Sequence, residues 1–242
     1  GLDSLKTLRA MYENSSGGIE KPAAFIVEVL QAEGGVNLAS DEWLKALQQL
    51  AKDLGALIIV DDIQSGCGRT GHYFSFEQSG LEPDIITLAK GIGGIGTPMA
   101  MNLVKPEYDD HWQPGEHTGT FRGQNISFIA GREALRYFEN DELMVDTRRK
   151  GEVMASHLQE IAQKYSDKGF SVRGKGMMQA LDMGDGTLAK AIASDCFEYG
   201  MLLAPCGVGG AVIKLIPPLT IPDEDLNAGL AILSESFERI IK

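Results

Sequence analysis

The sequence is poor in the residues that would indicate a secreted, membrane-bound or nucleic-acid-binding protein. It has only three cysteines in 242 residues and no C-x-x-C pair, and its four histidines show no metal-ligand spacing, so neither a disulfide framework nor a metal site is expected. No apolar run approaches a membrane span, and no signal peptide is visible. Lysine and arginine number 22 against 34 acidic residues, and the net charge of −12 disfavours nucleic acid or an anionic membrane as a partner. We therefore expect a cytoplasmic globular protein.

An initial methionine is also lacking, because the chain begins Gly1-Leu2-Asp3-Ser4. Its first expected helix, at residues 3–13, leads directly to an apolar strand at residues 23–28. Simple loss of an initiator methionine would explain this start. We prefer the interpretation that the chain is the later part of a longer protein.

The first part of the chain alternates apolar strands with an amphipathic helix. Strands are expected at residues 23–28, 56–60, 84–88 and 98–104, and a helix at residues 40–54. Consecutive aliphatic residues such as Leu57-Ile58-Ile59-Val60 are typical of a strand buried on both faces. Strand, helix and strand in this order predict βαβ units, an α/β fold and a mostly parallel sheet over residues 1–145.

The second part of the chain has a different character. After two expected helices at residues 125–140 and 141–165, short β-like runs broken by glycines occur at residues 170–172, 177–183 and 212–216. Helices are expected at residues 187–199 and from residue 222 to about 241. We interpret residues 146–242 as a small α+β domain.

Polar side chains follow two of the apolar strands. Asp61, Asp62 and Gln64 come after the strand at residues 56–60, and Lys90 follows the strand at residues 84–88. The carboxyl ends of strands in open α/β sheets are where ligands bind. An anion, an amide and an amine at neighbouring strand ends suit pyridoxal phosphate, which has a basic ring nitrogen and an aldehyde. Two alternatives remain open: the carboxylates are a solvated strand end or a helix cap, and Lys90 lies in solvent just beyond its strand.

Five segments resemble a known family in order and spacing. Residues 60–71 resemble the D-E-[IV]-Q-[TS]-G-x-G-R-T-G signature of the class III, omega-type, pyridoxal-phosphate aminotransferases, and residues 87–94 resemble their Schiff-base lysine segment. Residues 26–35, 117–123 and 217–221 resemble three further family segments. The resemblance implies the fold-type I architecture, with part of the large domain followed by the small C-terminal domain.

The resemblance also implies a role for each matching residue. Lys90 would bind pyridoxal 5′-phosphate as a Schiff base and, when freed, move the proton at the substrate Cα. Asp61 would pair with the pyridinium nitrogen, and Gln64 would donate a hydrogen bond to the ring oxygen. Thr120 would reach the cofactor phosphate of the neighbouring subunit, which implies a homodimer with a shared active site. Glu28 would lie beside the site and contact the substrate.

The chain departs from the family pattern at three points. Lys214 stands where many relatives have an arginine that binds a substrate carboxylate and pairs with a glutamate, here Glu33. Lysine is a point charge rather than a planar fork, so bidentate recognition would weaken; a plain surface lysine is the alternative. Asp62 stands where glutamate is more usual, which should matter little. Third, the family's N-terminal segment, which contains the phosphate-binding loop, is not found before Glu28 in this sequence.

The amino-acid sequences of these segments are similar to those of the diaminobutyrate aminotransferases of ectoine biosynthesis. This similarity implies transfer of an amino group between L-glutamate and L-aspartate 4-semialdehyde, giving L-2,4-diaminobutyrate and 2-oxoglutarate. Another omega-aminotransferase of the ornithine, acetylornithine or 4-aminobutyrate type is the first alternative. A non-catalytic fragment that keeps the fold but binds cofactor poorly is the second.

Overall fold

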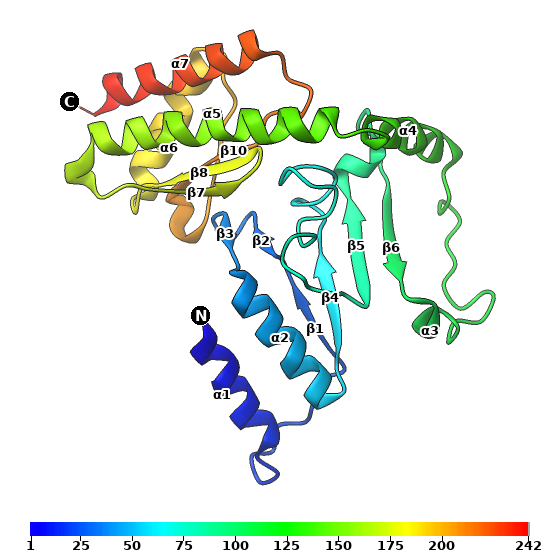
Figure 1. The fold of residues 1–242 in the computed structure, drawn as a ribbon. Coiled ribbons are helices and arrows are strands. Elements are labelled where there is room, and N and C mark those ends of the chain that lie inside the picture. Colours follow the sequence, from blue (N-terminus) through cyan, green and yellow to red (C-terminus); the bar gives the residue numbers. More distant parts are fainter. Residues whose placement is uncertain (242) are drawn as a thin grey trace. The chain divides into compact units, whose positions relative to one another are not determined.

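The computed structural model describes residues 1–241, and it divides into two compact units. Unit 1 comprises Gly1–Val29, Ala39–Cys67 and Phe74–Glu139, and unit 2 comprises Leu30–Leu38, Gly68–Tyr73 and the chain from Asn140 onward. Figure 1 colours the elements of both units along the sequence. Within residues 1–241, the helices are all too short or too polar to cross a membrane.

Unit 1 is built on a four-stranded sheet. Its strands lie in the order β1 (Ala24–Val27), β4 (Leu57–Asp61), β5 (Ile85–Ala89) and β6 (Ala100–Val104). β1, β4 and β5 run parallel, and β6 lies antiparallel to β5 at the edge. The prediction of an α/β fold with a mostly parallel sheet is confirmed, with one antiparallel strand.

Helix α2 (Asp41–Leu54) packs on this sheet, with α1 (Leu2–Glu13) beside α2 (Figure 1). Ser40 caps α2 through a hydrogen bond accepted from the Trp43 N–H, and Gly55, with a φ of 72°, ends it in the left-handed region. The buried apolar face of α2 shares a core with strands β1 and β4: its members include Leu44, Leu47, Leu50, Ala51, Leu54, Ile58 and Val60. This core holds α2 against β4.

The remainder of unit 1 follows β5. A single 3₁₀ turn, η1 (Lys90–Gly93), comes directly after it, and the short α3 (Pro106–Asp109) follows β6. Helix α4 (Asn125–Leu135) continues as a 3₁₀ turn, η2 (Arg136–Phe138), so the helix expected at residues 125–140 changes form near its end.

Unit 2 is built on a four-stranded antiparallel sheet. Its order is β7 (Ser171–Lys175), β8 (Met178–Asp182), β10 (Val212–Leu215) and β9 (Ala204–Cys206), of which β9 was not expected from the sequence. The helices of this unit are α5 (Glu142–Lys164), α6 (Gly186–Glu198) and α7 (Asp223–Ile240), with 3₁₀ turns η3 (Ser166–Lys168) and η4 (Val208–Gly210). The predicted boundary at residues 145/146 falls inside α5.

Two short segments from the first part of the chain belong to unit 2. Leu30–Leu38 forms a small hairpin of β2 (Leu30–Gln31) and β3 (Asn37–Leu38), and Gly68–Tyr73 is a loop. Apolar side chains bury the hairpin against the sheet of unit 2: Leu30, Ala32, Val36, Met178, Ala180, Cys206 and Val212. The sequence did not indicate this exchange, because both segments lie between strands of unit 1.

Candidate active site

The centre of the candidate site is formed by two adjacent strand ends in unit 1. β4 ends at Asp61, which is paired with Thr87 of the parallel strand β5, and Lys90 follows β5 directly. Asp61 and Lys90 are therefore at the carboxyl ends of neighbouring strands, as the sequence predicted. Parallel pairing is what brings them together, because both strands then end at the same edge of the sheet.

Lys90 has an unusual backbone conformation. Its φ is 53°, and Cys67, in the loop after β4, also has a φ of 53°. Such left-handed angles are uncommon for residues with a side chain, and they concentrate at functional sites. The two turns touch each other, because a Cβ on Gly91 would lie 3.1 Å from the Cβ of Cys67. The side chain of Lys90 is exposed, in agreement with the alternative that it lies just beyond its strand.

A hollow lies next to Lys90. It has a volume of about 500 Å³ and is lined by Lys90 and residues 96–100, all in unit 1. The glycine-rich turn after Lys90 packs on α4, since a Cβ on Gly94 would lie 2.9 Å from the Ala130 carbonyl oxygen. The turn therefore needs glycine at this position to keep the wall of the hollow in place.

Asp61 and Asp62 have different environments. Asp61 is half-buried, and its Oδ1 accepts a hydrogen bond from the Ile63 N–H at 3.1 Å. Asp62 is fully buried: its Oδ1 accepts from the Ser65 hydroxyl at 2.8 Å and its Oδ2 from the Ser75 N–H at 3.0 Å. Burial raises the pKa of the Asp62 carboxyl despite these hydrogen bonds.

Asp62 therefore organises the loop that carries Gln64. The Gly66 N–H donates to the Asp62 carbonyl, and a Cβ on Gly66 would lie 2.7 Å from both the carbonyl oxygen and Oδ2 of Asp62. The carboxylate of residue 62 thus holds the turn directly after Asp61, and the small effect of aspartate in place of glutamate stays a prediction. Sequence analysis missed Ser65 and Ser75 as its partners; only the folded loop brings Ser75 to Asp62.

Unit 2 contains the other predicted charged pair. The Lys214 Nζ lies 2.5 Å from the Glu33 Oε1, and the Lys214 side chain is only 2% exposed whereas that of Glu33 is 74% exposed. The Glu33 turn is held on the sheet by the Gly207 N–H, which donates to the Glu33 carbonyl, and by the Arg173 Nε, which donates to the Gly35 carbonyl. The alternative of a plain surface lysine is therefore wrong.

Glu28 and Thr120 are the two remaining predicted residues. Glu28 is half-buried and directly follows β1, which is the strand next to β4. Thr120 is exposed in the segment between α3 and α4, where the neighbouring Phe121 is 94% exposed. Within the described residues, Thr120 makes no hydrogen bond that would tie it to Lys90 or Asp61.

These groups fit pyridoxal 5′-phosphate. The ring nitrogen needs a carboxylate and the aldehyde needs an amine, and Asp61 and Lys90 supply these groups at adjacent strand ends. Gln64 comes three residues after Asp61 in the turn that Asp62 organises, and the hollow beside Lys90 leaves space for a ligand. Within the described residues there is no cluster of three or more side chains suited to a metal ion.

Comparisons with known proteins show which family the chain belongs to. Residues 4–237 match the family model "Aminotransferase class-III". The chain is 43% identical to a diaminobutyrate–2-oxoglutarate transaminase of Wolinella succinogenes over 100% of its own length and 56% of that protein. It is 43% identical to the protein of the same name from Marinococcus halophilus, over 98% of this chain and 56% of that one.

The solved structures include similar folds. An acetylornithine aminotransferase from Elizabethkingia anophelis matches with a TM-score of 0.83 and 28% identity, over 97% of this chain and 58% of that one. The chain thus spans about half the length of the proteins that it matches.

Proposed function

Because this chain belongs to the class III aminotransferases, we propose that the protein containing it catalyses transamination with pyridoxal 5′-phosphate. The observation that carries the proposal is the placement of Asp61 and Lys90 at the carboxyl ends of the adjacent parallel strands β4 and β5. When bound, pyridoxal phosphate supplies an aldehyde that takes up the amino group and a ring that draws electrons from the substrate.

The proposed roles follow from the chemistry of each side chain. Asp61 holds the proton on the ring nitrogen, because a carboxylate beside that nitrogen favours its charged form. Gln64 donates an amide hydrogen to the ring oxygen, and Lys90 binds the cofactor and moves the proton at the substrate Cα. Glu28 lies beside the site as a substrate contact, and Thr120 contributes to the phosphate site of a second subunit.

The proposed substrates are L-glutamate and L-aspartate 4-semialdehyde, with L-2,4-diaminobutyrate and 2-oxoglutarate as products, the reaction of ectoine biosynthesis. Two relatives at 43% identity support it through the reaction in their name. In unit 2, Lys214 and Glu33 form the pair that we assign to recognition of a substrate carboxylate. Since Lys214 is a point charge beneath an exposed glutamate, we expect weaker orientation of the carboxylate than an arginine would give.

We further propose a homodimer. The support is apolar surface on α4 and the segment before it, in unit 1: Ile126 is 66% exposed, Ile129 64% and Phe121 94%. Large apolar side chains grouped on one surface are typical of a protein interface. Thr120, adjacent to Phe121, would then be presented to the second subunit.

The test of the cofactor assignment uses Lys90→Ala in the whole protein, with Lys52→Ala, an exposed lysine of α2, as the matched control. We expect wild type and the control to show the absorption band of lysine-bound pyridoxal phosphate and the Lys90 variant to lack it. A variant that keeps the band, or a wild type without one, would refute the proposal.

The substrate assignment is tested separately. The whole protein is supplied with 2,4-diaminobutyrate, ornithine or 4-aminobutyrate, each with 2-oxoglutarate, and kcat/KM is compared. We expect 2,4-diaminobutyrate to be preferred. Turnover confined to ornithine or 4-aminobutyrate would contradict this assignment and leave the cofactor assignment standing.

A further inference from the structure

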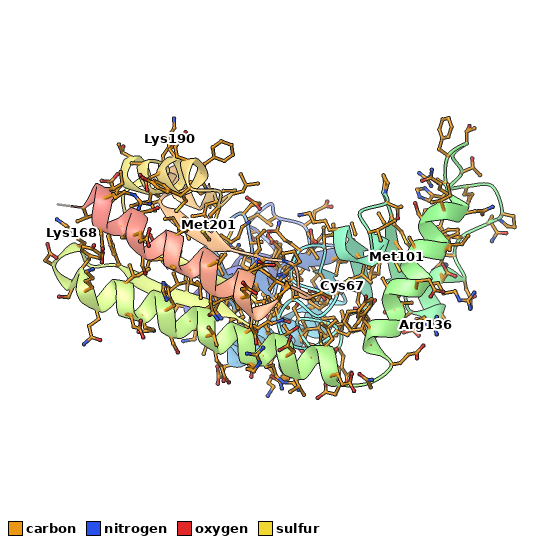
Figure 2. The ribbon with its side chains drawn as sticks, turned by 90° about the horizontal axis from the view of Figure 1, so that it is seen from above. Cys67, Met101, Arg136, Lys168, Lys190 and Met201 are labelled. Atoms are coloured by element: carbon orange, nitrogen blue, oxygen red, sulfur yellow. The ribbon has the colours of Figure 1, made fainter. Side chains whose placement is uncertain are left out.

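The segment Gly68–Tyr73 belongs to unit 2 although it directly follows the turn that carries Asp61 and Gln64. Figure 2 labels Cys67, the last residue of unit 1 before this segment. The segment closes on itself, because the Gly68 N–H donates to the Tyr73 carbonyl at 3.2 Å and the Gly71 N–H to the Gly68 carbonyl at 2.9 Å. The family signature of residues 60–71 is therefore divided between the two units.

The segment lies directly on the turn that joins β7 to β8. The Met177 N–H donates to the Arg69 carbonyl at 2.9 Å. Gly176, in the same turn, has a φ of 56°, and a Cβ there would lie 2.5 Å from the Thr70 carbonyl carbon and 2.8 Å from the Gly71 nitrogen. The two backbones approach so closely that no side chain fits between them.

The side chain of Arg69 makes a second connection. Its Nη1 donates to the Met177 carbonyl at 3.3 Å and to the Pro217 carbonyl at 2.5 Å. Within the described residues Arg69 has no ion-pair partner, and burial lowers its pKa to about 10. A partly buried guanidinium that is bound only to carbonyls has no opposite charge to offset its desolvation, so its role lies in the geometry that it fixes.

The hydrogen bond from Arg69 to Pro217 is close in sequence to Lys214. Pro217 lies two residues beyond the end of β10 at Leu215 and three residues beyond Lys214. Proline has no N–H, so its carbonyl is the only backbone group through which this point can be hydrogen-bonded. Arg69 thus fixes the path of the chain directly after the strand that carries Lys214.

We propose that Arg69 is a positioning residue for substrate binding: through Met177 and Pro217 it sets the end of β10 and with it the Lys214–Glu33 pair. This proposal rests on the proposed function, because it assigns substrate recognition to Lys214. It gives the G-R-T-G half of the signature a task different from that of the Asp61–Gln64 half.

Arg148 provides a matched control. It is also an arginine that donates to a carbonyl of this segment, with Nη1 2.7 Å from the Gly71 carbonyl, but it projects from α5 and pairs with Asp141. Within the described residues, its side-chain hydrogen bonds and ion pair do not involve Pro217 or β10. A variant at Arg148 therefore weakens the anchoring of the segment and leaves the strand end of Lys214 untouched.

The experiment compares Arg69→Met, Arg69→Lys and Arg148→Met in the whole cofactor-loaded protein. For Arg69→Met we expect the KM of the carboxylate-bearing substrates to rise on the order of tenfold or more, with kcat and the cofactor absorption band close to wild type. Arg69→Lys, which keeps the charge and a hydrogen-bond donor on a shorter side chain, should raise KM less. Arg148→Met should leave KM unchanged. Equal KM values for the two Met variants, or a loss confined to kcat, would overturn the proposal.

Hydrogen exchange gives a readout that does not require turnover. In Arg69→Met, amides of the 213–219 peptide should exchange faster, whereas in Arg148→Met the increase should be confined to the 66–74 peptide. Unchanged exchange at 213–219 in Arg69→Met would refute the positioning role even if the protein had no transaminase activity. Absence of activity in wild type would count against the proposed function alone.

Discussion

Replacing Asp62 tests whether a buried carboxylate organises the turn that carries Asp61 and Gln64. In Asp62→Ala the Ser75 N–H and the Ser65 hydroxyl both lose their acceptor, and both serines are buried. A buried donor left without a partner costs about 1–3 kcal/mol, and the serine hydroxyl can rotate to another acceptor whereas the N–H cannot. Removal of a desolvated charge offsets part of this loss. We expect Asp62→Ala to be destabilised by about 2 kcal/mol.

Asp62→Asn is the matched variant. The amide has nearly the same shape, its oxygen can accept from the Ser75 N–H, and its NH₂ group can donate to the Ser65 oxygen. Because the variant also removes the buried charge, we expect a loss of less than about 1 kcal/mol at neutral pH. The assay is urea denaturation of the cofactor-free protein, which reports the free energy of unfolding.

The pH dependence follows from the raised pKa of Asp62. In the folded protein this carboxyl holds its proton to a pH above its ordinary value of 3.8, so the folded state binds the proton more tightly than the unfolded state. The stability that this provides is fully present below pH 3.8 and is lost as the pH rises through the folded pKa. The advantage of wild type over Asp62→Asn should therefore grow as the pH falls toward 3.8. Equal losses in the Asn and Ala variants, or an advantage that shrinks on acidification, would refute the reasoning.

Two further substitutions test the packing of the separate units. Gly66→Ala would place a Cβ 2.7 Å from two oxygens of Asp62, so we expect weaker cofactor binding in a titration of the cofactor-free protein. The control is Gly17→Ala, in the exposed loop after α1. Equal cofactor affinity in both variants would contradict the close approach. Phe237→Ala removes a fully buried ring that contacts Tyr165 and Phe170, and should cost about 3–5 kcal/mol in denaturant unfolding of unit 2. A loss under about 1 kcal/mol would show that this aromatic cluster is not tightly packed.

The local elements and the strand-end chemistry could be predicted from the sequence. The aliphatic run ending at Asp61 and the run ending before Lys90 indicated parallel strands, because only a strand covered on both faces tolerates such uninterrupted hydrophobicity. Ser40 and Gly55 similarly marked the ends of α2. Once the strands are parallel neighbours, the positions of Asp61 and Lys90 at one sheet edge follow directly.

Other features depend on contacts between residues far apart in the chain, which local pattern does not encode. The assignment of Leu30–Leu38 and Gly68–Tyr73 to unit 2 is one example, since partners such as Met178 and Met177 lie more than a hundred residues later. The burial of Lys214 beneath Glu33 is another, because a lysine on a strand can point either to solvent or to a partner.

The sequence by itself therefore determined the fold class and the carboxylate and amine of the candidate site, since each depends on short-range periodicity and on where apolar runs stop. Tertiary structure alone decided what Asp62 and Arg69 do. Both are charged residues in one continuous loop, yet Asp62 is enclosed by Ser65 and Ser75 in unit 1 and Arg69 by carbonyls of Met177 and Pro217 in unit 2. The physical reason is that the energy of a charge is set by the groups that surround it after folding, and these come from distant parts of the chain.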